Sequence, residues 1–332
     1  MANVPEIHPP SSILHPRPIF LAGPTAVGKS AMALALAEKI SGEIITVDSM
    51  QVYRGLDIGT AKPTAEERRR VPHHLLDVCD LNESFDAAQF VRLAQKAVTE
   101  IHSRGRTPIF CGGTGLYFKA FIEGLGEAPP ADEKLRAELE AAPLEQLLAE
   151  LRERDPVTFE KIDRQNPRRI VRAVEVIRLT GKPFSEQKAR WGERPREPLL
   201  VSDAGSRGRS PHQFSASRLI CFTRAATDLQ VRINARVDEM FRLGLVDETQ
   251  KLLKHGLAEN KFALQAIGYR QVVEHLRGER GLAATIELVK IRTRQFAKRQ
   301  LTWLRRHGNC EWVELKPGET VDETLGKITT PP

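Results

Sequence analysis

Cysteine is scarce in this sequence: it has 4 cysteines among 332 residues, at positions 79, 111, 221 and 310. No two of them form a C-x-x-C pair, so the sequence argues against a zinc site and against a disulfide framework. Isolated cysteines are typical of proteins in a reducing compartment.

Long apolar runs are also lacking. The longest ones, such as residues 19–22 and 31–37, are far shorter than the ~20 residues that a helix needs to span a bilayer. The first 16 residues contain four prolines and no apolar signal-peptide segment. We therefore expect a flexible N-terminal tail at 1–16, a cytoplasmic location and no membrane partner.

Acidic residues are the minority among the charged ones. The chain has 43 Asp and Glu against 50 Lys and Arg, a net charge of +7. A basic excess favours polyanionic partners such as nucleic acid, although solubility alone also produces basic surfaces. Hydrophobic residues make up 41%, enough for a sizeable core in one large or two modest domains.

Strand-like and helix-like segments alternate in the first third of the chain. In order they are 17–23 (strand), 29–40 (helix), 42–49 (strand), 85–105 (helix) and 107–113 (strand). This alternation predicts an α/β fold, a P-loop NTPase-like core with a parallel, doubly wound sheet. Sites in such sheets lie at the carboxyl ends of strands, where Gly23, Asp48 and Gly112 stand.

The pattern changes in the middle of the chain. Residues 127–200 contain short amphipathic segments and no strand, which predicts a helical insertion. Residues 201–216 are rich in Ser, Gly and Arg and predict a mobile basic loop. A strand-like run follows, so we expect the core to comprise 17–126 plus 217–310, with 311–332 as a C-terminal tail.

The octapeptide GPTAVGKS matches G-x-x-x-x-G-K-[ST] between a strand and a helix. Glycines let the backbone wrap a phosphate, and the free amides and the helix dipole attract it. The lysine adds a positive charge, and the last hydroxyl can hold Mg²⁺. The predicted diphosphate- or nucleotide-binding residues are Gly23, Pro24, Thr25, Ala26, Val27, Gly28, Lys29 and Ser30, with Ser30 as the metal ligand.

Polar residues follow the next two strands. Asp48, in DSMQVYRGLDIGTAKP, could hold Mg²⁺ through water or act as a general base, and a turn cap explains it equally well. Gln51 has the amide that reads an adenine edge, but Gln after a strand is common. Thr114 in GGTG offers a hydroxyl to a ligand, or belongs to a tight structural turn.

Basic residues cluster in two segments of helical spacing. In NPRRIVRAVEVIR, Arg168 and Arg172 share one face, while Ile170, Val174 and Ile177 line another. The segment KIRTRQFAKRQLTWLRR carries seven basic residues and no acid. One such stripe is usually a solvated helix face, but two beside a phosphate loop favour binding to a nucleic-acid backbone.

Several segments together resemble the tRNA dimethylallyltransferase family, the bacterial tRNA isopentenyltransferases. In chain order they are GPTAVGKS, DSMQVYRGLDIGTAKPT, VPHHLLD, GGTGLYF, RRIVRAVEV with TGKP, GYR and TRQFAKRQLTW. The resemblance extends from Arg17 to Arg306. Its departures are small, since Ser30 stands where Thr is frequent and Arg270 where Lys is common.

The resemblance implies a reaction. It is the transfer of a dimethylallyl group from dimethylallyl diphosphate to N6 of the adenine at tRNA position 37, in tRNAs reading codons that start with U. Pyrophosphate would leave, so the phosphate loop would hold the prenyl diphosphate and not ATP. The implied partners are the tRNA anticodon stem-loop and dimethylallyl diphosphate, the implied cofactor is Mg²⁺, and the protein would be a monomer.

The resemblance also implies residue roles. Asp48 would take the N6 proton, and Gln51 would hold the edge of the adenine after it has been turned out of the loop. Lys29, Thr25 and Arg224, with Mg²⁺ and the loop amides, would stabilise the leaving pyrophosphate. The residues implied to contact tRNA are Asp48, Ser49, Met50, Gln51, Thr114, Arg136, Arg168, Arg169, Ile170, Val171 and Arg172.

Two other functions fit a phosphate loop. A small-molecule kinase would move the γ-phosphate of ATP, but this leaves the basic helical insertion unexplained. An RNA-binding NTPase would hydrolyse ATP, but the sequence lacks an evident acidic metal residue at the end of a further apolar strand. Neither alternative accounts for the segment Asp48–Gln51 as economically as the transferase function does.

Overall fold

The computed structural model describes residues 16–124, 128–189, 219–306 and 310–329. The expected tail at 1–16, apart from its last residue, and the expected loop at 201–216 lie outside this part. The chain divides into two compact units, which are described separately below. The first comprises Met1–Ile122 and Gln213–Pro332, and the second Glu123–His212.

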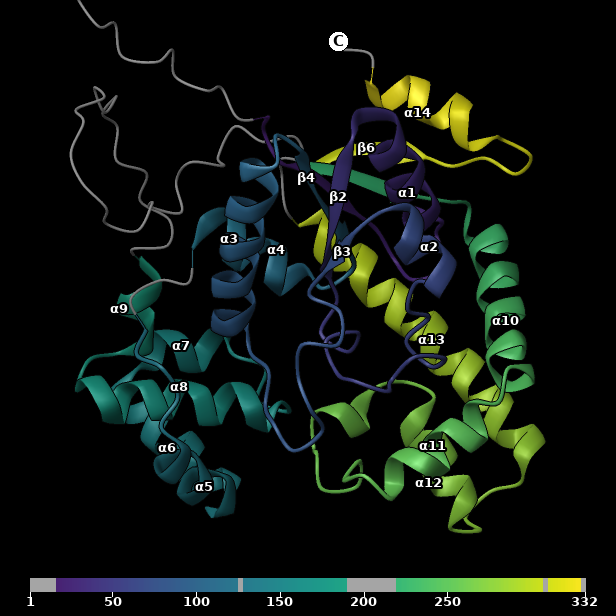
Figure 1. The fold of residues 1–332 in the computed structure, drawn as a ribbon. Helices are drawn as coiled ribbons and strands as arrows, with labels where there is room; N and C mark the ends of the chain where they lie inside the picture. The colour runs from purple at the N-terminus through teal and green to yellow at the C-terminus, as the bar shows by residue number, and fades with distance from the viewer. Residues whose placement is uncertain (1–15, 125–127, 190–218, 307–309, 330–332) are drawn as a thin grey trace, which may run out of the picture. The chain divides into compact units, whose positions relative to one another are not determined.

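A six-stranded parallel sheet forms the centre of the first unit, in the order β3-β2-β4-β1-β5-β6 (Figure 1). The strands are β1 Ile19–Ala22, β2 Gly42–Val47, β3 His73–His74, β4 Thr107–Gly112, β5 Leu219–Thr223 and β6 Cys310–Glu314. The predicted α/β fold with a parallel sheet is therefore confirmed.

Helices cover both faces of this sheet because its strands are apolar on both sides. Phe20 and Leu21 alternate on β1 and enter two different buried clusters, one packed under α1 and the other under α3 and α4. The helices of the unit are α1 Lys29–Ile40, α2 Ala65–Arg70, α3 Ala87–Ser103, α4 Gly115–Glu123, α10 Ala226–Arg242, α11 Leu245–Leu253, α12 Tyr269–Leu276, α13 Leu282–Arg305 and α14 Val321–Thr329.

The C-terminal residues belong to this unit and do not form a separate tail. β6 pairs in parallel with β5, and Leu325 and Ile328 of α14 join the cluster under α1. The expected boundary at residue 311 is corrected accordingly. The strand was hard to recognise because only Val313 of its five residues is buried, as suits the edge of a sheet.

Three strand ends are aligned at one edge of the sheet. Gly112 at the end of β4 pairs with Ala22 of β1 on one side and with Val47 of β2 on the other. The segments that follow these strands therefore start side by side. The strand ends at which Gly23, Asp48 and Gly112 stand therefore lie next to one another, and a functional site at this edge stays a prediction.

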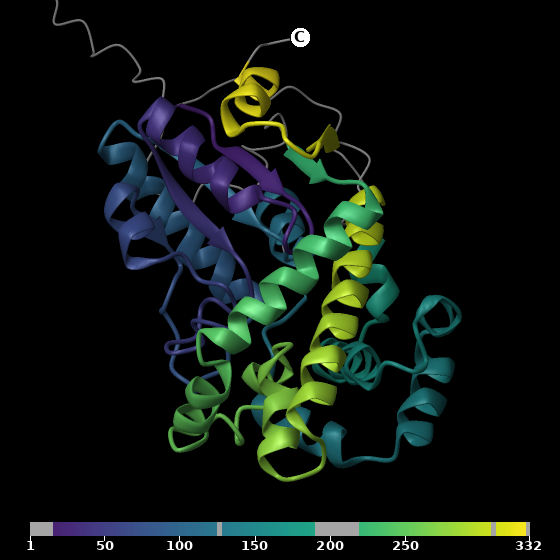
Figure 2. The same cartoon turned by 90° about the vertical axis from the view of Figure 1, so that its right-hand side faces the viewer.

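Beyond this edge lie α11 and α12, which share a third buried cluster with Val52, Tyr53 and Leu56. The long helices α10 and α13 pack against each other (Figure 2). Among the described residues, no helix is both long and apolar enough to cross a membrane.

The second unit is helical in its described part. Its helices are α5 Glu133–Ala141, α6 Leu144–Arg154, α7 Pro156–Lys161, α8 Pro167–Thr180 and α9 Phe184–Ala189. Asn166 caps α8 and Gly181 ends it in the left-handed region, as the sequence NPRR…TGKP favours. Ile170, Val174 and Ile177 form the buried face of this helix, as predicted.

Candidate functional site

The phosphate loop, residues 23–30, joins β1 to α1. Gly28 lies in the left-handed region with φ of 111° and directly precedes the first turn of α1. No side chain caps this helix, so its first amides stay available to an anion. The loop is thus built as the GPTAVGKS pattern predicts.

Two arginines hold the outer side of the loop. Arg224 Nε donates to the carbonyl of Val27 at 2.7 Å, and Arg232 Nε donates to that of Ala26 at 3.0 Å. Because N–H and C=O point in opposite directions across a trans peptide, the arginine at Val27 turns the amide of Gly28 away from itself. Arg224 also pairs with Asp228 at 2.8 Å. Its direct contact with a leaving pyrophosphate stays a prediction.

Three cations gather at the loop: Lys29, Arg232 and Arg236. Lys29 Nζ donates to the carbonyl of Pro24 at 3.2 Å. Burial lowers the pKa of Lys29, and the positive charge of Arg236 acts in the same direction. Burial and the neighbouring Arg232 likewise lower the pKa of Arg236. Within the described chain, none of the three forms an ion pair with an acid, so the cluster favours binding of an anion.

Arg232 and Arg236 were missed in the sequence analysis. They lie four residues apart in RINAR, hence on one face of α10. Every exposed basic helix offers the same spacing, and nothing local indicates that this face meets a loop some 200 residues earlier in the chain.

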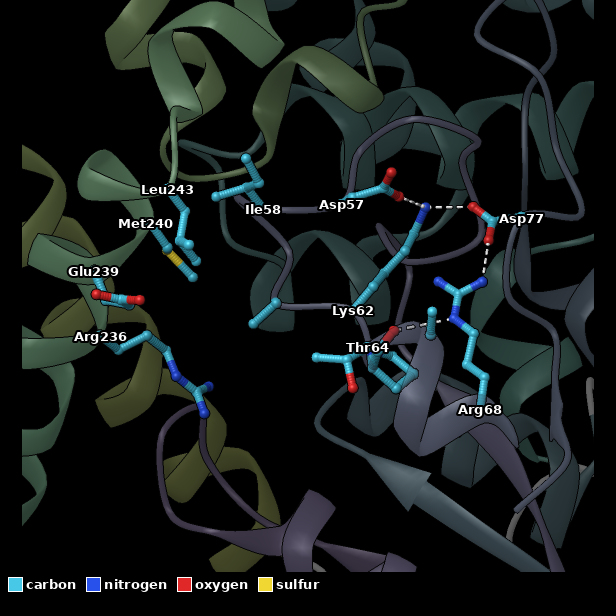
Figure 3. A pocket seen from close by; sticks show the side chains of 13 residues that line it. Asp57, Ile58, Lys62, Thr64, Arg68, Asp77, Arg236, Glu239, Met240 and Leu243 are labelled. Carbon is cyan, nitrogen blue, oxygen red and sulfur yellow. Dashed lines mark hydrogen bonds and ion pairs between the residues drawn. The ribbon is translucent and has the colours of Figure 1, made fainter. Parts of the chain in front are cut away.

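Arg236 also lines an open cavity of about 610 Å³ between α10 and the segment 57–68 (Figure 3). Across the cavity, Lys62 is held by Asp57 at 2.8 Å and also by Asp77. Figure 3 marks no ion pair between Arg236 and the other residues drawn. Arg68 pairs with Asp77 at 2.7 Å, so among the described residues that line the cavity Arg236 is the cation without an acidic partner.

Asp48 directly follows β2 and is half-buried. Its Oδ1 accepts hydrogen bonds from the amides of Met50 at 2.8 Å and Gln51 at 3.2 Å, so the turn-cap interpretation is correct for this oxygen. No described residue donates to Oδ2. One oxygen shapes the turn, and the other is left for a proton or a metal-bound water.

The side-chain amide nitrogen of Gln51 is bonded to backbone carbonyls nine and ten residues further along the chain. Nε2 donates to the carbonyls of Thr60 at 2.9 Å and Ala61 at 3.2 Å. In this arrangement its Oε1 is left to accept from an adenine amine, so the prediction that Gln51 holds adenine is not tested.

The segment that holds Gln51 is itself fixed by α11 and α12. The Tyr269 hydroxyl accepts from the amide of Gly59 at 3.0 Å and donates to Glu248 at 2.6 Å. Glu248 also accepts from the amide of Ile58 at 3.0 Å. The GYR segment therefore supports the DIGTAKP segment, a link that the sequence alone did not reveal.

Thr114 lies beside the Asp48 turn. Its Oγ1 accepts from the amide of Ser49 at 3.2 Å, and the amides of Gly113 and Thr114 donate to the carbonyl of Val47. The structure thus brings Asp48, Ser49 and Thr114 together with the phosphate loop at the sheet edge. Whether they contact tRNA stays a prediction.

In the second unit the predicted tRNA-binding residues fall into three groups. Arg168 and Arg169 are exposed at the start of α8. Arg136 and Arg172 both bond the fully buried carboxylate of Glu175 at 2.6 Å.

Ile170 and Val171 form the third group, and they are 0% and 6% exposed inside the helical cluster. Their burial argues against direct contact of these side chains with tRNA. Their side chains pack inside the unit because consecutive residues of α8 cannot all face solvent when one side of the helix packs against its neighbours. Contact of tRNA with the backbone at these two positions stays a prediction.

A family model described as IPP transferase matches residues 51–307 of the chain. This chain belongs to the IPP transferase family. A tRNA dimethylallyltransferase of Trichlorobacter lovleyi is 46% identical over 304 residues, which cover 90% of this chain and 94% of the relative.

Solved members of the IPP transferase family share the fold. The full-length tRNA isopentenylpyrophosphate transferase of Bacillus halodurans has 39% identity and a TM-score of 0.65 over 94% of both chains. A eukaryotic dimethylallyltransferase described as acting on tRNA has 27% identity and a TM-score of 0.75, over 94% of this chain and 77% of its own.

Mg²⁺ suits the oxygen atoms around the loop. Ser30 is exposed in the first turn of α1, and Asp48 Oδ2 is uncommitted. Among the residues that the structure describes, no three His, Cys, Asp or Glu cluster as a metal site. Mg²⁺ bound mainly by substrate phosphates and water needs only one or two protein oxygens, so such a residue set is sufficient.

We expect Glu175→Gln to destabilise the second unit by about 3 kcal/mol, because it leaves two guanidinium groups beside a neutral buried side chain. Denaturant unfolding measures this. The control is Glu160→Gln, because the ion pair of Glu160 with Arg164 is exposed to solvent and contributes little to stability. Equal stability of the two variants would contradict the importance of the buried carboxylate.

Proposed function

We propose that this chain transfers a dimethylallyl group from dimethylallyl diphosphate to N6 of an adenine in tRNA and releases pyrophosphate. The adenine is that at position 37, in tRNAs reading codons that start with U. Curated relatives that cover most of this chain carry the name tRNA dimethylallyltransferase. Membership of the family argues against the kinase and NTPase alternatives.

One observation carries the proposal on structural grounds. A carboxylate with one uncommitted oxygen, Asp48, follows a strand end aligned with those of the phosphate loop and Thr114. The loop itself is surrounded by Lys29, Arg232 and Arg236, which lack acidic partners in the described chain. A base beside an anion site is what this reaction requires.

The residues divide the chemistry between them. As the C–O bond of the prenyl diphosphate breaks, negative charge grows on pyrophosphate, and Lys29 and Arg236 stabilise it together with the amides at the start of α1. Arg224 holds the carbonyl of Val27 and so keeps the amide of Gly28 turned inward, and Arg232 holds the carbonyl of Ala26. The hydroxyl of Thr25 adds a further donor.

At the nucleophile, the free oxygen of Asp48 accepts the N6 proton as the new bond to the allylic carbon forms. Gln51 accepts from the adenine amine through Oε1 and so favours adenine over bases without that amine. The base must first leave its stack, because N6 is not accessible within the anticodon loop. Ser30 would hold Mg²⁺, which would neutralise part of the pyrophosphate charge.

The decisive experiment uses two parallel reactions with the full chain, Mg²⁺ and an unmodified tRNA with adenine at position 37. One contains labelled dimethylallyl diphosphate and the other γ-labelled ATP. We expect label in tRNA from the first reaction only. Phosphate release or transfer from ATP without prenylated tRNA would replace the proposal with a kinase or an NTPase.

Exposed arginines of α8 suit the phosphate backbone of tRNA. We expect Arg168→Gln with Arg169→Gln to weaken tRNA binding and to reduce the slope of log affinity against log salt by about 1 to 2. Arg172 is not used here because its loss would remove one of the two guanidinium groups that pair with the buried carboxylate of Glu175. Filter binding over a salt series measures the slope, and an unchanged slope would make this end of α8 an ordinary solvated surface.

A further inference from the structure

Gln300 of α13 contacts two segments of the site at once. Its Oε1 accepts from the amide of Thr25 in the phosphate loop at 2.9 Å. Its Nε2 donates to the carbonyl of Gly113, just after β4, at 3.0 Å. The side chain is buried, with 8% exposed. It belongs to the TRQFAKRQLTW segment, whose function the proposed mechanism does not use.

Among the described residues, no hydrogen bond other than those of Gln300 links Thr25 to Gly113, although the Cys111 thiol donates to the carbonyl of Lys29 further inside the sheet. The β2 side is joined by backbone, since the amides of Gly113 and Thr114 donate to the carbonyl of Val47. On the β1 side the ladder ends at the pair Ala22 and Gly112. Past this pair, among the described residues, only the side-chain amide of Gln300 joins Thr25 to Gly113 by hydrogen bonds.

The geometry points to Gln300 as a positioning residue for the proposed transfer, one that fixes the separation between the diphosphate loop and the GGTG turn, which is itself bonded to the end of β2 beside Asp48. This inference rests on the proposed function. The nucleophile and the electrophile are held by different strand ends, so their approach depends on how these ends are joined. A misplacement of about 1 Å can cost about 10²-fold in rate.

Only an amide of this length satisfies both partners. Thr25 offers a donor and Gly113 an acceptor, so the linking side chain must accept at one end and donate at the other. Gly113 leaves the necessary space, because a Cβ there would lie 2.1 Å from Gln300 Nε2. Glu at position 300 would still accept from the amide of Thr25. Its second carboxylate oxygen would face the carbonyl oxygen of Gly113, and these two acceptors repel each other.

The test measures single-turnover prenyl transfer with saturating tRNA and dimethylallyl diphosphate, along with the separate affinities for pyrophosphate and tRNA. We expect Gln300→Met to lower the rate by about 30- to 100-fold with both affinities unchanged. The saturated rate of Gln300→Glu should fall less, because Glu keeps the bond to Thr25, while its negative charge beside the loop lowers pyrophosphate affinity. The control is Gln295→Met, an exposed glutamine of the same helix, which should retain the wild-type rate.

Gly113→Ala approaches the same junction from the other side. We expect it to slow transfer, and its effect should be less than additive with that of Gln300→Met, since one link is broken in both. If the methionine variant does not fold, Gln300→Glu and Gly113→Ala carry the test.

Three results would overturn the inference. Wild-type rates in the folded Gln300 variants would do so, as would rate losses explained by weaker pyrophosphate or tRNA binding. The third is full additivity with Gly113→Ala. A wild-type protein that fails to prenylate tRNA would instead overturn the proposed function, and the inference with it.

Discussion

Replacing Asp48 with Asn should reduce the single-turnover rate of prenyl transfer by about 10²- to 10⁴-fold, the range typical for loss of a general base. Asn keeps the oxygen that accepts from the amides of Met50 and Gln51, so the turn should persist. The substitution replaces Oδ2, to which no described residue donates, with a neutral amide nitrogen. Affinity for tRNA should therefore stay close to that of the wild type.

Asp86→Asn is the matched control. Asp86 caps α3, because its Oδ1 accepts from the amide of Gln89 at 2.8 Å. The Asp-to-Asn change is therefore made at a second carboxylate that caps a backbone amide. Its variant should transfer at the wild-type rate. A normal rate for Asp48→Asn would restrict Asp48 to its capping role, and an equal loss of tRNA affinity would show that the turn, not the proton transfer, had been damaged.

The sheet and the place of the site could be predicted because they depend on local pattern. β-branched and apolar residues in 42–47 and 107–112 are buried on both faces, and the end of each strand is followed by Asp48 or the GGTG turn. β6 could not be predicted with the same certainty, since an edge strand buries one side only. Its sequence CEWVE is short and carries two glutamates, so it gives only a weak strand signal.

The partners within the site could not be predicted, because they join residues distant in sequence. Nothing near Arg232, Arg236 or Gln300 indicates that α10 and α13 bring them to the phosphate loop. For Asp48 the sequence left three roles open, a turn cap, a general base or a holder of Mg²⁺ through water, as if they excluded one another. A carboxylate has two oxygens, and the structure engages only one of them in the cap.

The second large effect concerns Lys29. We expect Lys29→Met to weaken pyrophosphate binding and to slow transfer at saturation by about 10²-fold, because the amine stabilises charge that grows on the leaving group. Arg236 and Arg232 remain beside the loop, so some affinity should persist. Calorimetry with pyrophosphate and single-turnover kinetics measure the two effects, and Lys39→Met, at the exposed end of α1, is the control.

Lys29→Met should weaken pyrophosphate binding but should not lower the stability of the protein without a bound anion. Burial lowers the pKa of Lys29, so the charged amine is held at a cost when no anion is bound. An unfolded chain then binds more protons than the folded one between the lowered pKa and 10.5, and stability rises with pH in that window. Lys29→Met should melt no lower than the wild type, yet gain less from added pyrophosphate. A lower melting temperature together with a full pyrophosphate response would mean that Lys29 supports the fold and that another group holds the diphosphate.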